Sequence, residues 1–218
     1  MTRNVPPAGK VLRHPAPLRL IHWTHVSVTL ALAFTGFDLA HPFLPPRLFP
    51  PKYARLAHST LASALAATFA LWLYYAFTTG AWRELLPDRR DWRTAGALLR
   101  YELLLSEDSP MHGKYHLIQK VLYLSFHLAI GLQILTGWAL AAYVTRSGSL
   151  LIRLAGGLQR IRTVHHFAAL YLVLTSTLHL YRALTDPRLV VAMITGWGHA
   201  GPPLDTPAEK AIRPPESR

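Results

Sequence analysis

Four long apolar stretches dominate the chain, and shorter polar segments rich in proline and charge separate them. A hydrocarbon core of about 30 Å takes about 20 helical residues to cross, and each stretch is at least that long. A soluble helical protein, the alternative, rarely needs apolar helices of this length. The pattern therefore predicts an all-α integral membrane four-helix bundle. The expected spans are Leu18–Ala40, Leu56–Thr79, Leu117–Val144 and Thr163–Leu184.

The segments outside the spans divide the chain into three parts. Residues 1–17 form a short basic arm, residues 18–200 the four-span domain, and residues 201–218 a charged, Pro-rich tail that we expect to be flexible. Residues 82–101, between the second and third spans, are charged and aromatic, and we expect them at the cytoplasmic interface. Residues 145–162 mix apolar and basic side chains, which favours a short surface helix.

The absence of cysteine from the 218 residues narrows the possible metal chemistry. It excludes disulfides, cysteine-ligated iron–sulfur clusters and haem attached through thioether bonds. Any metal site must therefore use histidine and oxygen ligands.

The net charge of +12 raises the question of nucleic acid. The Lys and Arg residues lie between the apolar stretches and not on one amphipathic face, so we exclude nucleic-acid binding. Most of these 23 residues lie in the two termini and in the connection between the second and third spans. Because positive loops stay in the cytoplasm, both termini are expected to be cytoplasmic.

A recurring pair of residues marks the ends of three spans. A histidine lies about one turn inside the membrane, and an arginine one turn away lies nearer the water. Two imidazoles can ligate the iron of haem b, while guanidinium groups pair with its propionates. Ionisable residues within spans also point to function. The pairs are Arg19–His22, Arg55–His58, Arg162–His165 and, in the reverse order, His179–Arg182.

The fourth span carries two of these histidines. His165 and His179 are 14 residues apart, which is about 21 Å along a helix and within about 40° of one face. One helix can thus give one ligand to each of two haems. By depth, His58 pairs with His165 near the outer surface, and His22 pairs with His179 near the inner surface.

Three alternatives remain open for these histidines. Any single one of them could be an interfacial residue hydrogen-bonded to a neighbouring helix. His166 could replace His165 as a ligand, and His25 could replace His22.

Together these residues resemble the cytochrome b subunits of membrane-bound formate dehydrogenases, nickel–iron hydrogenases and thiosulfate reductases. The resemblance covers roughly residues 13–198. The segments that carry it are Arg19-Leu-Ile-His22-Trp23, Ala54-Arg55-Leu-Ala-His58, Gly113-Lys114-Tyr115-His116-Leu-Ile-Gln119-Lys120, His165, His179-Leu-Tyr-Arg-Ala and Met193-Ile-Thr-Gly196-Trp197.

The resemblance implies four spans, two haems b and the same histidine pairing. It also implies a bacterial or archaeal cell membrane, and partners that are separate chains. An iron–sulfur subunit on the periplasmic side, attached to a catalytic metalloenzyme subunit, would deliver electrons to the outer haem, and quinone would react near the inner one. The substrate-converting subunit would then be a separate chain.

The resemblance also implies a quinone pocket beside the Gly-Lys-Tyr segment, with His116 and Gln119 as candidate contacts. The family usually has asparagine where this chain has His116. A protonatable histidine could exchange a proton with a quinone oxygen. Alternatively, His116 simply lies at the interface.

The favoured hypothesis is a membrane-anchoring electron-transfer subunit between a periplasm-facing oxidoreductase and quinone. One alternative is a stand-alone membrane haem b redox protein, and another is the quinol-oxidising subunit of a thiosulfate reductase-type complex. A third, from a different class, is a haem-free four-span transporter or scaffold.

Overall fold

The computed structural model describes residues 10–40, 50–103, 105–106, 115–143, 146–185 and 187–199. Four of the helices within these residues are long and apolar enough to cross a membrane, and each corresponds to one of the expected spans. Three contain the expected span whole, whereas the third of the four ends at Ala141, before the expected end of its span at Val144. The predicted all-α four-helix architecture is therefore confirmed. The long helices are α1 (Ala16–Ala40), α2 (Pro51–Thr79), α4 (Leu117–Ala141) and α6 (Leu158–Thr185).

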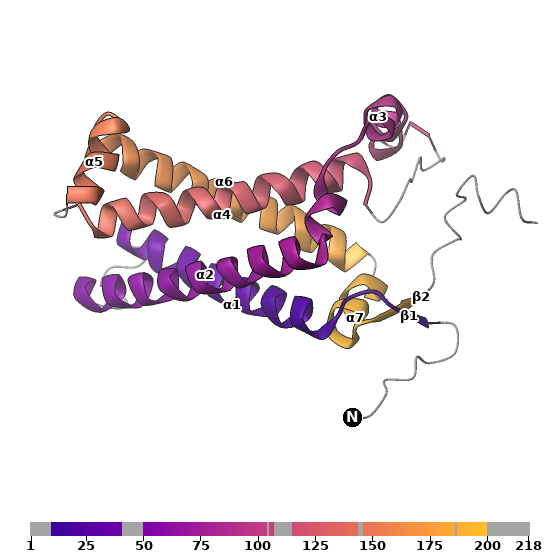
Figure 1. The fold of residues 1–218 in the computed structure, drawn as a ribbon, viewed down its shortest axis with the longest axis horizontal. Coiled ribbons are helices and arrows are strands. Elements are labelled where there is room, and N and C mark those ends of the chain that lie inside the picture. Colours follow the sequence, from indigo (N-terminus) through magenta and orange to yellow (C-terminus); the bar gives the residue numbers. More distant parts are fainter. Residues whose placement is uncertain are drawn as a thin grey trace, which may run out of the picture.

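The long helices form two antiparallel pairs, α1 with α2 and α4 with α6, which lie side by side (Figure 1). The short helix α5 (Arg146–Leu154) lies at one end of the bundle. The opposite end carries α3 (Arg89–Glu102) and α7 (Pro187–Thr195). We refer to these as the α5 end and the α7 end.

Local chemistry sets the ends of the helices. Pro51 occupies the first turn of α2, where its missing N–H costs nothing, and Gly80 ends that helix with a left-handed φ of 75°. A capping box starts α4: the Gln119 N–H donates to His116 Nδ1 (3.4 Å), and the His116 N–H donates to Gln119 Oε1 (3.2 Å). His116 is therefore a helix cap.

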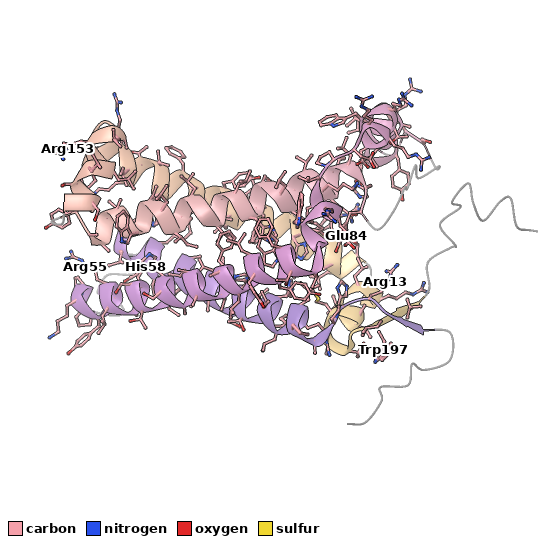
Figure 2. All side chains as sticks on the ribbon, in the orientation of Figure 1. Arg13, Arg55, His58, Glu84, Arg153 and Trp197 are labelled. Carbon is pink, nitrogen blue, oxygen red and sulfur yellow. The ribbon has the colours of Figure 1, made fainter. Side chains whose placement is uncertain are left out.

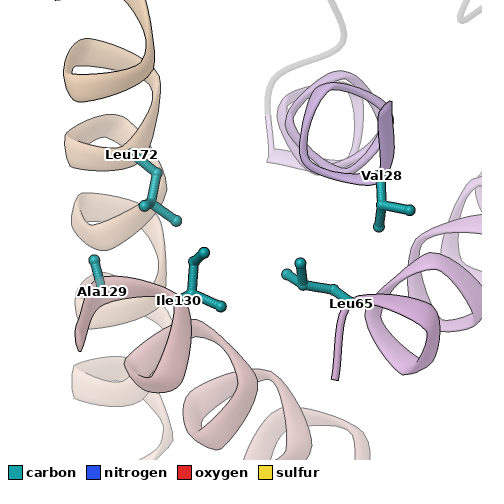
Figure 3. Close-up of a cluster of buried hydrophobic side chains, with 5 residues drawn as sticks. All are labelled: Val28, Leu65, Ala129, Ile130 and Leu172. Atoms are coloured by element: carbon teal, nitrogen blue, oxygen red, sulfur yellow. The ribbon is translucent and has the colours of Figure 1, made fainter. Parts of the chain in front are cut away.

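The packed core lies at the middle of the bundle. Its buried side chains come from all four long helices (Figure 3) and are Val28, Leu65, Ala129, Ile130 and Leu172. Leu172 is seven residues from both His165 and His179. The core therefore lies between the two ends of the bundle.

Large apolar side chains also cover the outside of the long helices. Phe77 is 65% exposed, Leu128 67% and Leu174 59%. Contiguous exposed apolar surface is unfavourable in water and suits contact with lipid tails. This surface supports a bundle that spans a membrane.

A two-stranded antiparallel ribbon joins the two ends of the chain, and the sequence did not predict it. It pairs β1 (Lys10–Leu12) with β2 (Trp197–His199), with Val11 opposite Gly198. Both strands lie at the α7 end (Figure 1). Residues 10–12 and 197–199 therefore lie at the same end of the bundle.

The start of α1 holds α7 in place. The Arg19 guanidinium donates to the carbonyl of Ile194, and Trp23 Nε1 donates to the carbonyl of Met193 (3.2 Å). Gly196 follows α7 with a left-handed φ of 88°, and a Cβ there would lie 2.9 Å from the His14 carbonyl oxygen. Only glycine fits this junction without strain.

The connections contain shorter helices. Residues 82–101, expected at the interface, form the 3₁₀ helix η1 (Ala81–Leu85) and most of α3. An ion pair between Lys120 Nζ and Asp91 Oδ2 (2.7 Å) joins α4 to α3. The short surface helix expected in residues 145–162 is present as α5. The first nine residues of the basic arm, residues 113–114 and the tail 201–218 lie outside the described residues.

Candidate functional site

One continuous cavity of about 2050 Å³ runs between the two helix pairs. All four long helices line it, and His22, His58, His165 and His179 are among the lining residues. Pockets for small ligands usually measure about 300–1,000 Å³. The cavity therefore has room for more than one large ligand.

The histidines face each other in two pairs within this cavity. The ring centroids of His58 on α2 and His165 on α6 are 6.4 Å apart, with 77° between the ring planes. Those of His22 on α1 and His179 on α6 are 6.2 Å apart, with 60° between the planes. The structure thus brings together the same pairs that the depth argument predicts.

The spacing of each pair fits a metal held between two imidazoles. With a metal–nitrogen bond of about 2 Å, and a ring centroid about 1 Å behind each nitrogen, the centroids would be about 6 Å apart. No three His, Asp or Glu side chains in the described part of the chain converge on one point. Each pair would therefore fit a metal that takes only two ligands from the protein, as the iron of a haem can.

A threonine orients His58. Thr35 Oγ1 lies 2.9 Å from His58 Nδ1 and also donates to the carbonyl of Ala31 (2.8 Å). A hydroxyl has one proton, which the Ala31 carbonyl takes, so the oxygen accepts from the imidazole. His58 then carries its hydrogen on Nδ1 and presents the lone pair of Nε2 for a metal.

The same arrangement recurs on the other helix pair. Thr136 Oγ1 lies 2.8 Å from His165 Nδ1 and donates to the carbonyl of Leu132 (2.7 Å). His165 is therefore also oriented with Nε2 as the metal-binding nitrogen.

The glycine after each threonine makes room for the ring. A Cβ at Gly36 would lie 3.1 Å from His58 Cε1, and one at Gly137 would lie 3.3 Å from His165 Cε1. The two Thr-Gly pairs therefore cradle the two imidazoles at the α5 end. The sequence reasoning missed the threonines, although Thr-Gly occurs near the same end of the first and third spans.

The His22–His179 pair has different neighbours. The ring of Trp23 meets His22 edge to face (5.3 Å), and Tyr123 meets His179 in the same way (5.9 Å). Among the described residues, neither imidazole of this pair forms a hydrogen bond. The pair at the α7 end is therefore held by packing alone.

The alternative histidines point elsewhere. His166 makes an edge-to-face contact with Phe37, at a centroid distance of 6.0 Å. His25 lines the cavity one turn from His22, and its Nε2 is buried without a hydrogen-bond partner among the described residues. The geometry favours His165 over His166 and His22 over His25 as members of facing pairs.

The four predicted arginines differ in their surroundings. Arg55 and Arg162 line the cavity at the α5 end, where Figure 2 shows Arg55 next to His58. Arg182 lines the α7 end and pairs with Glu102 (3.3 Å). Arg19 is engaged with α7. Arg13, which the sequence reasoning did not select, lines the cavity at the α7 end (Figure 2).

The candidate quinone residues adjoin the His22–His179 pair. Gln119 lines the cavity, whereas His116 lies behind it and is only 7% exposed. His116 Nε2 faces Glu102 Oε1 at 3.6 Å. Burial lowers the pKa of His116, with an opposing effect from Glu102 and a smaller lowering from Arg182. His116 is therefore neutral at pH 7, and its Nδ1 caps the start of α4 by accepting the Gln119 N–H.

Four apolar helices that hold two facing histidine pairs around one cavity define a membrane cytochrome b. Residues 13–196 match the prokaryotic cytochrome b561 family, and the chain belongs to that family. Membership implies that it binds haem b.

Similar proteins come from two kinds of complex. The chain is 26% identical to a probable Ni/Fe-hydrogenase B-type cytochrome subunit of Rhodobacter capsulatus, over 84% of this chain and 79% of that protein. A protein of the same description from Cupriavidus necator is 28% identical, over 84% and 85%. The formate dehydrogenase cytochrome b556 subunit of Haemophilus influenzae is 26% identical, over 86% and 76%.

Proposed function

We propose that the chain is the membrane-anchoring, di-haem cytochrome b subunit of a respiratory oxidoreductase of the hydrogenase or formate dehydrogenase type. It transfers electrons between an iron–sulfur and catalytic partner on the periplasmic side and the quinone pool. The observation that supports this proposal most strongly is the presence of two facing histidine pairs in one cavity, at opposite ends of four membrane-length helices.

In this proposal His58 and His165 hold one haem b, and His22 and His179 hold the other. Arg55 and Arg162 lie in the cavity at the first pair, where guanidinium groups can pair with propionates. At the second pair we assign this role to Arg182 and Arg19, and Arg13 is an additional candidate. Bound haem supplies reversible one-electron transfer.

The separation of the pairs supports transfer across the membrane. His165 and His179 lie about 21 Å apart along α6, which is most of a hydrocarbon core of about 30 Å. The chain therefore holds one site near each surface.

The α7 end is the proposed place of quinone reaction. Gln119, Tyr115 and Tyr123 line the cavity there, beside His179. Gln119 can hydrogen-bond to a quinone oxygen. His116, with its Nε2 toward Glu102, is the proposed proton-holding group behind Gln119.

The charge distribution supports an orientation. The α7 end carries both strands of the terminal ribbon and the basic helix α3, so the positive-inside rule assigns it to the cytoplasm. The α5 end then faces the periplasm, where the partner subunits would dock. The membrane is that of a bacterial or archaeal cell.

The test is to purify the chain, loaded with haem in vivo, from its native membrane in mild detergent. We expect two haems b per chain, reduction by added quinol, and co-purification of an iron–sulfur protein with a metalloenzyme. Fewer than two haems per chain would overturn the di-haem assignment. Two haems without any co-purifying metalloenzyme would favour the stand-alone redox protein. A preparation without a reducible b-type absorbance band would favour the haem-free transporter or scaffold.

A further inference from the structure

The two histidine pairs differ in the hydrogen-bond partners of their Nδ1 atoms. His58 and His165 each donate from Nδ1 to a threonine hydroxyl, at 2.9 and 2.8 Å. Each hydroxyl is itself fixed, because it donates to the carbonyl four residues earlier in its own helix. Neither His22 nor His179 has a hydrogen-bond partner within the described residues.

We infer that Thr35 and Thr136 are positioning residues that lower the redox potential of the haem held by His58 and His165. This inference rests on the proposed function, since it takes the two pairs as axial ligands. It names the residues that give the haem sites at the two ends of the bundle different redox potentials.

The physical reason lies in the imidazole. An acceptor at Nδ1–H pulls the hydrogen outward and makes Nε2 a stronger electron donor. A stronger axial donor stabilises ferric iron more than ferrous iron, which lowers the potential. The His58–His165 pair has two such acceptors, one on each side of the metal position.

The threonines also fix the angle of each ring. The oxygen of Thr35 is held by its own helix, so it holds the His58 ring at one rotation about the Cβ–Cγ bond. Gly36 leaves only enough space for that ring. Thr136 and Gly137 do the same for His165.

The consequence is a direction of electron flow. Electrons move spontaneously toward the higher potential. A lower potential at the α5 end favours transfer toward the His22–His179 pair and the Gln119 pocket, as quinone reduction requires. The hydrogen bonds of two threonines thus favour the hydrogenase or formate dehydrogenase direction over quinol oxidation.

The test is a spectroelectrochemical titration of the full chain, purified with both haems bound. Threonine to valine keeps the shape and removes the acceptor, so the double variant T35V/T136V is compared with the unaltered protein. We expect the lower of the two potentials to rise while the other stays. A rise of about 59 mV in that potential would correspond to a tenfold loss of preference for ferric over ferrous iron in a one-electron couple.

Two further variants separate tuning from structure. The double variant T35S/T136S restores the hydroxyls and should restore the unaltered potential. Thr68 on α2 donates to the carbonyl of Ala64 in its own helix (3.0 Å) and lies outside the lining of the cavity, so T68V is the matched control and should shift neither potential.

Each outcome decides the inference. Two haems with unchanged potentials in T35V/T136V would overturn it and leave the proposed function intact. A shift of the higher potential would overturn the assigned direction. If the valine variant lacks one haem altogether, the serine variant decides. If the serine variant keeps that haem at its original potential, the positioning role is supported. If the serine variant loses the haem too, the inference is overturned. Fewer than two haems in the unaltered chain would refute the proposed function itself.

Discussion

The two ends of the bundle offer the same pair of side chains in different surroundings. At the α5 end, each imidazole of the His58–His165 pair is bound by a threonine and backed by a glycine. At the α7 end, the His22–His179 pair contacts aromatic rings and opens toward Gln119. One site is held by hydrogen bonds, and the other adjoins polar groups that can bind a substrate.

This difference teaches that identical ligands need not make equivalent sites. The hydrogen bonds at Nδ1 act on the electron affinity of the site that they hold. The polar groups at Gln119 are proposed to exchange protons with quinone. In this proposal both ends of the bundle transfer electrons, and only the α7 end also exchanges protons.

The largest expected effect comes from removing single histidines. H58A and H165A should each lose the haem at the α5 end, and H22A and H179A the haem at the α7 end, because each altered site would keep only one of its two histidine ligands. Haem content, measured by difference spectra against protein, should fall by half in all four.

The control for these variants is H166A, because His166 faces Phe37 and not a histidine. It should keep both haems. If H166A loses a haem and H165A retains two, His166 is the ligand. If all four single variants keep two haems, the pairing is wrong.

A smaller effect is expected from the ion pair that docks α3 at the α7 end. Lys120 and Asp91 are 11% and 5% exposed. K120M leaves the carboxylate buried and unpaired, which costs about 3–5 kcal/mol. Thermal unfolding in detergent should show this loss, whereas K52M, a change at an exposed lysine of the α5 end, should cost under about 0.5 kcal/mol.

The double variant D91N/K120M sharpens this prediction. It removes both charges, while the amide oxygen introduced by D91N can still accept from the Asp88 N–H, as Asp91 does at 2.8 Å, so most of the lost stability should be recovered. A K120M protein that is as stable as K52M would show that the pair contributes nothing to docking of α3.

The smallest effect concerns the pH dependence of His116. Its folded-state pKa is lowered, so the unfolded chain binds more protons and stability falls as the pH drops below the ordinary value of 6.5. Protonation at Nδ1 would also remove the acceptor that caps α4. Glu102 and Arg182 are the charged groups that face this histidine.

Asparagine is a strong N-cap that does not titrate. H116N should therefore keep the cap and lose less stability than the unaltered protein as the pH falls below 6.5. H116A should lose about 1 kcal/mol near neutral pH, and its difference from the unaltered protein should shrink in acid as His116 protonates and releases the cap. Melting temperatures from about pH 5 to 8 test both. An equal acid loss in H116N and the unaltered protein would contradict the assigned role of His116.

The sequence by itself determined much of this architecture. Length and hydropathy placed the four long helices, because a bilayer requires about 20 apolar residues in a row. The depth of each histidine, read from its distance to the span ends, grouped His58 with His165 and His22 with His179, as the structure places them.

Only the tertiary structure decided which neighbours these histidines have. The rotation of one helix against another brings Thr35 to His58 and Thr136 to His165, and no local pattern encodes that rotation. The same holds for the contact of Arg19 with α7: the motif predicts a propionate partner for this guanidinium, and the fold adds a hydrogen bond to the Ile194 carbonyl. The strand pairing of Val11 with Gly198 joins residues from opposite ends of the chain. Hydropathy reports the medium that a residue prefers, whereas a hydrogen bond depends on a distance that exists only once the helices have packed.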